Sequence, residues 1–375
     1  MNKEFDLIVF GATGFTGDLV CNYLSTHKDA KNLNWAIAGR NLEKLSKISR
    51  KYSVEYIVAD SFDLDSLNEM CSRGEVIIST VGPYMIYGEN LIYSCIKNKS
   101  HYLDLTGEPE FVLNMAKKYS KEALDSGSMI IHCCGFESIP ADVGVFEALK
   151  EIPEDNVKLS FYLKTKGQIS GGTWASFLNS VINPKTAISA TPRKKEKSKN
   201  KKIFYAKRFK RWALFFPVID KYIVYKSIEN INRTLKGVSF NQYILQKSFL
   251  SMILLIGSIF TLSIIAKISV IRKQLLKLIP SGSGPSADKR KNNWFEATIL
   301  AEGKEREVVT IIKGGDPGYG ETSKFISEMA LAIIVNNEEL LNDKGILTPI
   351  ECAGEILPRR LQNAGISIKT TLKVK

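Results

Sequence analysis

Three glycines near the start of the chain have the type and spacing needed to hold a phosphate. They recur every third residue in "VFGATGFTGDL", residues 9–19. The first permits a tight turn, the second lets backbone N–H groups approach a pyrophosphate, and the third lets a helix pack closely. Apolar residues predict a strand before the loop and a helix after it. We interpret this stretch as a dinucleotide-binding loop rather than a plain strand–helix turn. The loop consists of Gly11, Ala12, Thr13, Gly14, Phe15, Thr16 and Gly17.

The end of the second predicted strand indicates which dinucleotide binds. The apolar run "NWAIAGR", residues 34–40, ends on Arg40. NAD sites usually place a carboxylate here, which accepts hydrogen bonds from the ribose hydroxyls. An arginine instead pairs with the 2′-phosphate of NADP. A solvated arginine at the start of a helix is the alternative, and we predict NADP as the cofactor.

Two further strand ends are expected to line the same edge of a parallel sheet. Strand 55–60 ends on Asp60, which we expect beside the adenine, and strand 75–84 runs into a Gly-Pro turn. Ligands of open α/β sheets bind beyond the carboxyl ends of the strands. Val81, Gly82 and Pro83 therefore lie where a nicotinamide ribose would rest. Strands at 101–108 and 128–140 continue the alternation with helices, so a doubly wound parallel sheet, a Rossmann domain, is predicted.

Reduction by a nicotinamide cofactor also needs a proton donor opposite the hydride. Tyr84 follows the Gly-Pro turn, and Tyr319 stands in "DPGYG", where turn chemistry explains the proline and glycine but not the tyrosine. These two are our predicted catalytic residues. His132 lies in an apolar strand and fits a core histidine. No metal-ligand cluster and no Ser/His/Asp set is visible, so no metal is predicted. The other candidates near the expected nicotinamide are Asp104, Glu108 and Cys134.

Several longer motifs carry a family resemblance across nearly the whole chain. The chain resembles the saccharopine dehydrogenase-like oxidoreductases, and within them the branch of trans-acting enoyl reductases. The resemblance implies an NADP-binding Rossmann domain followed by a mixed α/β domain that covers the nicotinamide face. Glu137 stands where members of the family commonly carry Asp. The motifs are "GATGFTG", "AGR", "TVGPY", "YLDLTGE", "CGFESIPAD", "SGGTWAS", "PSGSGPSADKRKNNWF", "GGDPGYGETSKF" and "GILTP".

The expected organisation is an α/β chain with two domains and a C-terminal segment. We predict an NADP-binding domain over 1–134, a mixed α/β substrate or dimer domain over 135–339, and a segment over 340–375 that packs back on the first domain. Residues 156–167 alternate as a half-buried strand should, and 292–315 predict a hairpin of two strands.

One apolar segment, 248–266, has no charged residue over a length at the lower edge of a membrane span. A span would place the strands before and after it on opposite sides of a bilayer, although these strands are expected to pair. An apolar helix lying in a lipid surface or docking an apolar substrate fits better. Core burial and a true span are the remaining alternatives.

The formal charge of +13 is concentrated in residues 193–211, which hold eleven lysines or arginines and the single carboxylate of Glu196. We expect a basic loop, either solvated or attracted to anionic lipid by roughly 1 kcal/mol per residue. No nucleic-acid-binding fold accompanies it, so no nucleic acid is expected. The partners left open are an anionic membrane surface, an acidic carrier protein and a second copy of the chain.

Function and location follow from these features. We predict an NADPH-dependent reductase of an apolar, lipid-like or carrier-bound substrate. A lipid-associated protein that retains NADP binding without turnover, and a saccharopine-type amino-acid dehydrogenase, are the alternatives. Charges at residues 3, 4 and 6 leave no signal peptide, and unpaired cysteines indicate reduced thiols, so we expect a cytoplasmic protein at a membrane surface. The cysteines are Cys21, Cys71, Cys95, Cys133, Cys134 and Cys352.

Overall fold

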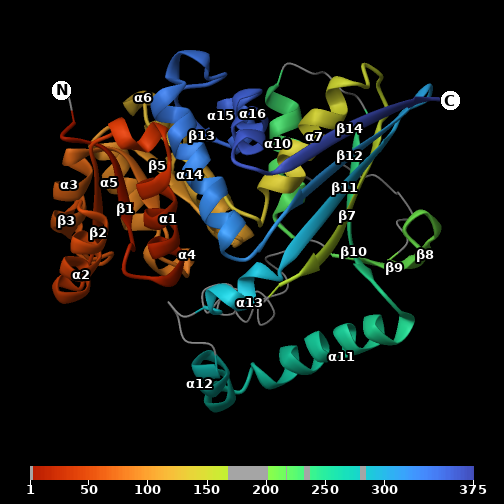
Figure 1. Ribbon diagram of the computed structural model, residues 1–375, viewed down its shortest axis with the longest axis horizontal. Helices are drawn as coiled ribbons and strands as arrows, with labels where there is room; N and C mark the ends of the chain where they lie inside the picture. The colour runs from red at the N-terminus through yellow and green to blue at the C-terminus, as the bar shows by residue number, and fades with distance from the viewer. Residues whose placement is uncertain (1–2, 168–201, 217, 232–236, 279–283) are drawn as a thin grey trace.

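The computed structural model describes residues 3–167, 202–216, 218–231, 237–278 and 284–375. Within these ranges the chain forms two seven-stranded sheets with helices around them (Figure 1). The first sheet is parallel throughout, in the order β13-β6-β5-β4-β1-β2-β3. Its strands are β1 (Phe5–Phe10), β2 (Trp35–Gly39), β3 (Glu55–Val58), β4 (Gly74–Ser79), β5 (His101–Asp104), β6 (Met129–Ile131) and β13 (Gly345–Leu347).

The predicted doubly wound sheet is confirmed, because apolar runs buried on both faces form its central strands. β1 lies between β2 and β4, so the chain winds outward in both directions from this point. The carboxyl ends of β1 and β4 flank the crevice where such sheets bind ligands. The helices of this domain are α1 (Phe15–Thr26), α2 (Leu42–Tyr52), α3 (Leu64–Arg73), α4 (Tyr84–Tyr87), α5 (Glu89–Lys97) and α6 (Pro109–Ser126).

The second sheet is mixed, in the order β14-β12-β11-β7-β10-β9-β8. The predicted hairpin is confirmed by the antiparallel pairing of β11 and β12, and β7 pairs with β11 on its other side. Helix α7 lies close against this sheet at Gly144, where an added Cβ would lie 2.1 Å from Cδ1 of Ile299. The strands are β7 (Lys158–Lys166), β8 (Ile203–Ala206), β9 (Arg211–Phe215), β10 (Ser239–Gln246), β11 (Trp294–Glu302), β12 (Arg306–Gly314) and β14 (Ser367–Val374).

The C-terminal residues contribute to both sheets, since β13 pairs with β6 and β14 pairs with β12. A buried ion-pair cluster also joins the halves: Arg360 binds Glu328 at 2.7 Å and Asp29 at 2.8 Å. The later helices are α7 (Ile139–Lys150), α10 (Asp220–Asn230), α11 (Phe249–Ile265), α12 (Ser269–Leu278), α13 (Ala287–Lys291), α14 (Gly320–Val335), α15 (Pro349–Ala353) and α16 (Ile356–Asn363).

The basic run was expected to be a loop, and for its described part this expectation is wrong. Residues 203–206 and 211–215 form the antiparallel edge pair β8–β9. Aromatic residues between the charges explain the difference, because the Phe204 ring packs edge-on against Tyr243 with centroids 5.1 Å apart. Residues 193–201 and the motif "SGGTWAS" lie outside the described residues.

Candidate functional site

The glycine loop joins β1 to α1, and close contacts require glycine at two of its positions. Gly11 has φ +90°, and an added Cβ would lie 2.6 Å from Oγ1 of Thr80. A Cβ on Gly17 would lie only 2.2 Å from the carbonyl oxygen of Gly11. The loop therefore brings the start of α1 close to the end of β1, as the spacing of the glycines predicts.

The free end of α1 has the properties of a phosphate cradle. Gly14 is the N-cap residue, and it has no side chain that could accept a hydrogen bond from the first-turn N–H groups. A Cβ on Gly14 would meet only the carbonyl oxygen of Gly11, at 3.2 Å. Ala12 is buried, whereas Thr13, Phe15 and Thr16 are half-buried. Uncapped N–H groups at the positive end of a helix fit a pyrophosphate.

Arg40 and Asp60 stand at the ends of the neighbouring strands β2 and β3. A Cβ on Gly39 would lie 3.9 Å from Oγ1 of Thr13, which places the end of β2 beside the glycine loop. Arg40 is exposed there, and Asp60 accepts a hydrogen bond from the N–H of Phe62 at 2.9 Å. The guanidinium is accessible for pairing with a phosphate on the adenosine ribose.

The turn after β4 is held in place by a carboxylate from the end of β5. Val81, Gly82 and Pro83 are half-buried and lead into α4. Glu108 accepts hydrogen bonds from the N–H groups of Tyr84 at 3.0 Å and Met85 at 3.1 Å. This carboxylate therefore caps α4 and fixes the turn that sequence reasoning assigned to the nicotinamide ribose.

The two predicted catalytic tyrosines are placed at different parts of the site. The Tyr84 hydroxyl donates to the carbonyl of Ser79 at 3.0 Å and accepts from the N–H of Leu105 at 3.2 Å, so it bridges the ends of β4 and β5. Burial raises the pKa of this phenol well above its usual value. Tyr319 is fully buried, and its ring meets Phe15 of the glycine loop edge-on with centroids 4.8 Å apart. A proton-transfer role for either tyrosine stays a prediction.

The other polar candidates form a buried network between β5 and β6. Oδ2 of Asp104 lies 2.6 Å from Nδ1 of His132, and Oδ1 accepts from the N–H groups of Thr106 and Cys133, both at 3.0 Å. Cys134 is also buried. His132 packs between Tyr102 and Phe111, as a core histidine does. The network shapes the strand ends that support the site.

One carboxyl group at these strand ends was not among the residues selected from the sequence. Glu137 follows β6, and Cβ positions built on Gly135 and Gly107 would lie 2.5 Å from its Oε2 and 3.8 Å from its Cβ. Its Oε1 is buried and, among the described residues, has no hydrogen-bond partner. Burial raises the pKa of this carboxyl to about 8, so it is largely protonated at neutral pH.

The segment that carries Glu137 is fastened to the second domain. The N–H of Phe136 donates to Oγ1 of Thr322 at 3.2 Å, and the Thr322 hydroxyl donates to the carbonyl of Pro317 at 2.8 Å. Two motifs far apart in the sequence, "CGFESIPAD" and "GGDPGYGETSKF", thus meet in one site. Within the described residues no group of His, Cys, Asp and Glu is arranged to hold a metal ion.

Comparison with known proteins assigns the chain to a family. Residues 7–131 match the family model of the saccharopine dehydrogenase NADP binding domain. A lipid droplet localized protein of Caenorhabditis elegans is 31% identical, over 94% of this chain and 94% of its own length. The chain belongs to the saccharopine dehydrogenase-like oxidoreductase family. As a member of this family it is an NADP-dependent oxidoreductase, and its glycine loop lies inside the matched domain.

Two further relatives of this saccharopine dehydrogenase-like oxidoreductase extend the comparison over its full length. A Mycobacterium tuberculosis protein whose name proposes a trans-acting enoyl reductase is 27% identical over 98% of both chains. Apo saccharopine dehydrogenase (L-Glu forming) from Saccharomyces cerevisiae superposes with a TM-score of 0.60 at 12% identity, covering 98% of this chain and 100% of its own. The latter similarity establishes the two-domain fold alone.

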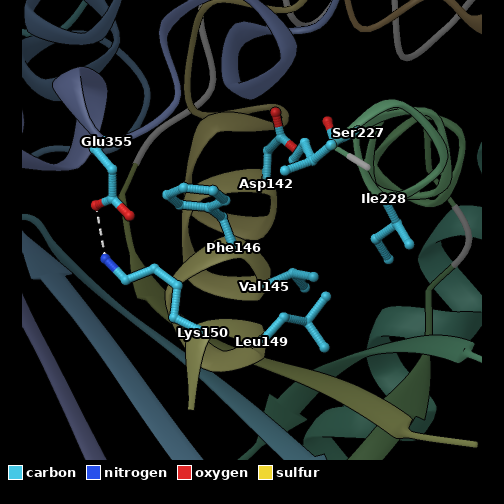
Figure 2. A pocket seen from close by; sticks show the side chains of 9 residues that line it. Asp142, Val145, Phe146, Leu149, Lys150, Ser227, Ile228 and Glu355 are labelled. Carbon is cyan, nitrogen blue, oxygen red and sulfur yellow. Dashed lines mark hydrogen bonds and ion pairs between the residues drawn. The ribbon is translucent and has the colours of Figure 1, made fainter. Parts of the chain in front are cut away.

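A separate pocket of about 150 Å³ lies between α7 and α10 of the oxidoreductase (Figure 2). Val145, Phe146 and Leu149 form its apolar wall, and the ion pair of Lys150 and Glu355, 2.7 Å apart, closes one side. At the other side is Asp142, whose pKa burial raises to about 7. This pocket shares no lining residue with the glycine loop.

The most exposed apolar surface lies on α11 and α12, which we call the apolar arm (residues 248–278). Figure 1 shows the arm set apart from both sheets. Met252 is the one residue of α11 that is buried, and Leu250 and Phe260 are 66% and 65% exposed. None of the described helices combines the length and the hydrophobicity of a membrane span. The other exposed apolar residues of the arm are Phe249, Ile253, Leu254, Ile256, Ile264, Ile268, Val270 and Leu278.

Proposed function

We propose that this oxidoreductase is an NADPH-dependent reductase of an apolar, lipid-like or carrier-bound substrate, and that the apolar arm holds it at a lipid surface. The observation that carries the reductase proposal is the Glu137 carboxyl at the carboxyl edge of the nucleotide-binding sheet, whose buried Oε1 has no hydrogen-bond partner among the described residues. A reduction needs a proton as well as a hydride, and an acid with a pKa near the working pH is suited to supply it.

The cofactor is assigned to the residues at the strand ends. In the proposal, the uncapped first-turn N–H groups of residues 15–17 bind the pyrophosphate, Arg40 binds the 2′-phosphate, and Asp60 lies on the adenine side. Val81, Gly82 and Pro83 support the nicotinamide ribose. When bound, NADPH supplies the hydride. The Glu108 carboxylate keeps the 82–85 turn in one conformation, and Tyr319 supports the glycine loop through Phe15.

Glu137 is the favoured proton donor because its Oε1 has no protein partner among the described residues. The Tyr84 hydroxyl already donates to a main-chain carbonyl, and moving its proton would break the contact between β4 and β5. Tyr319 is fully buried, whereas Glu137 as a residue is half-buried. Both tyrosines are retained as alternatives that a direct test separates.

The substrate class is inferred from the arm and from relatives. The Mycobacterium tuberculosis relative is named for enoyl reduction and the Caenorhabditis elegans relative for lipid droplets, and both cover nearly all of this chain. Bound NADPH would supply the hydride to one carbon of the activated alkene in a long-chain 2-enoyl thioester, and the Glu137 carboxyl would donate its proton to the other carbon.

Attachment to lipid is supported by the charges beside the apolar residues. The arm contains no Asp or Glu, and its cations flank the exposed apolar residues. An apolar helix with neighbouring cations is typical of segments that lie in a lipid interface. The cations of the arm are Lys267, Arg272, Lys273 and Lys277, and Lys247 immediately precedes it.

The test follows deuterium from 4-deuterated NADPH into a long-chain 2-enoyl thioester by mass spectrometry. We expect one deuterium in the saturated product and a loss of kcat of about a hundredfold or more in Glu137→Gln, with KM little changed. Glu137→Asp should restore most of the rate, because a carboxyl is retained. Tyr84→Phe and Tyr319→Phe are the matched variants. A larger loss in one of them than in Glu137→Gln would move the donor role to that tyrosine.

Two other outcomes would contradict the proposal as a whole. Tight NADPH binding without deuterium transfer to enoyl thioesters or to lipids extracted with the protein would favour a lipid-associated protein without turnover. Transfer to an imine formed from an amino acid and an oxo acid would favour the saccharopine-type alternative.

A further inference from the structure

A segment of the second domain folds back onto the glycine loop. Gly284 stands against Phe15 so closely that an added Cβ would lie 2.4 Å from Cε1 of the ring. Residues 284–291, including α13, therefore cover the first residue of α1. This contact joins parts of the chain that lie about 270 positions apart in the sequence.

The same segment places a cation beside the loop. The guanidinium carbon of Arg290 lies over the Phe15 ring, 5.4 Å from its centroid. The Nε of Arg290 is buried, and among the described residues no hydrogen-bond acceptor faces it. A buried N–H donor without an acceptor is uncommon in proteins, and it is accounted for where a ligand supplies the acceptor.

The neighbouring cations differ from Arg290 in this respect. Lys291 pairs with Asp288 at 3.1 Å, and Lys289 is exposed. The first-turn N–H groups of α1 also have no side-chain cap. Two independent sets of N–H donors that lack an acceptor among the described residues, one from each domain, therefore meet at Phe15. A guanidinium matches the geometry of phosphate oxygens through two parallel N–H groups.

We propose that Arg290 is a ligand of the cofactor pyrophosphate, contributed by the second domain to the loop of the first. The proposal rests on the cofactor role of the glycine loop and adds a contact that the nucleotide-binding motif does not contain. It differs from the role of Arg40, because the pyrophosphate is common to NADPH and NADH whereas the 2′-phosphate is not.

The test titrates NADPH and NADH into the full chain and measures both dissociation constants by calorimetry. Arg290→Gln should raise the dissociation constants of both nucleotides by about ten- to a hundredfold and leave the ratio of the two constants unchanged. Lys289→Gln, which removes the same charge one residue away, should change neither by more than about twofold. Arg40→Ser should weaken NADPH alone. The affinity of Arg290→Lys for each nucleotide should lie between that of the wild type and that of Arg290→Gln, because lysine keeps the charge but not the paired N–H donors.

The possible results distinguish a failure of the Arg290 role from a failure of the cofactor role proposed for the glycine loop. If the wild type binds and Arg290→Gln binds equally well, the role of Arg290 is wrong and the glycine-loop assignment is untouched. If Arg290→Gln loses affinity for NADPH only, Arg290 serves the 2′-phosphate and the proposal is overturned. If the wild type binds neither nucleotide, both the inference and the proposed function are wrong. Thermal unfolding of each variant, unchanged from the wild type, shows that the affinities refer to folded protein.

Discussion

Helices α1 and α11 differ both in how their sides are buried and in how their N-termini are capped. α1 buries four of its twelve residues and has a glycine as its N-cap, so its sides are packed and its end is free. α11 buries one of its seventeen residues, and a capping box between Ser248 and Ser251 satisfies its first turn. The ligand of α1 is therefore expected at its end, and the partner of α11 along its side.

The difference shows that hydrophobicity alone does not indicate what a helix packs against. α11 is more apolar than α1, yet it contributes one residue to the described core. Its contact with the body is at its start, where Phe249 meets Trp212 with ring centroids 4.8 Å apart. Large exposed apolar surfaces of this kind mark interaction sites rather than folding cores.

The largest contrast is expected from one substitution made in each helix. Gly17→Val places a Cβ atom 2.2 Å from the carbonyl oxygen of Gly11. Because this neighbour is a backbone atom, the clash can be relieved only if the loop opens. We expect a loss of about 3 kcal/mol in the free energy of unfolding and loss of NADPH binding. Gly257→Val meets nothing within 4 Å and should change stability by less than about 0.5 kcal/mol. Denaturant titration and calorimetry measure both, and equal losses in the two variants would contradict the comparison.

A smaller contrast is expected from pH. Burial raises the pKa of Asp220 in the body to about 8, whereas the arm has no carboxylate. Between about pH 4 and 8 the native state holds a proton on Asp220 that the unfolded chain releases, so stability falls as pH rises. His101, whose pKa burial lowers to about 4, gives the opposite slope up to about pH 6.5.

The contribution of Asp220 is obtained by comparing the pH dependence of the unfolding free energy in Asp220→Asn with that in the wild type. Asp220→Asn should flatten the decline of unfolding free energy between pH 6.5 and 8 by about 1–2 kcal/mol, because its side chain no longer titrates. Asp288→Asn, at an exposed position of α13, is the matched control and should keep the wild-type slope. Parallel pH profiles for wild type and Asp220→Asn would show that Asp220 does not titrate in this range.

Local patterns predicted the first domain well because each of its signals lies within a few residues. The run 5–10 became β1, and the glycine spacing produced the tight loop. β13 could not be predicted in this way, since three residues at 345–347 have no periodicity and join the sheet by pairing with β6. The edge pair β8–β9 was hidden by its charge, because aromatic packing across strands outweighs the cations between them.

The sequence predicted only those parts of the site whose residues all lie within one motif. Glu137 owes its raised pKa to burial by segments that follow β5 and β6, and burial is not visible in a list of residue types. Arg290 reaches the loop from the opposite half of the chain. Its motif "SADKRK" looks like an exposed helix start, and no local signal indicates that one of its cations lies over Phe15.

The apolar surface of the arm is proposed to bind a lipid interface rather than to stabilise the fold. The direct test is flotation of the full chain with vesicles that contain anionic lipid. The arm variant replaces Leu250, Leu254 and Phe260 by Ser. The control variant replaces three exposed apolar residues of the body, Leu42, Leu124 and Val335, by Ser.

The wild type and the control should float with the vesicles and be released only in part by salt, since salt screens charges but not apolar contacts. The arm variant should remain in the soluble fraction while its NADPH affinity and unfolding temperature match the wild type. Wild-type protein that does not float, or an arm variant that floats as well as the control, would contradict the account.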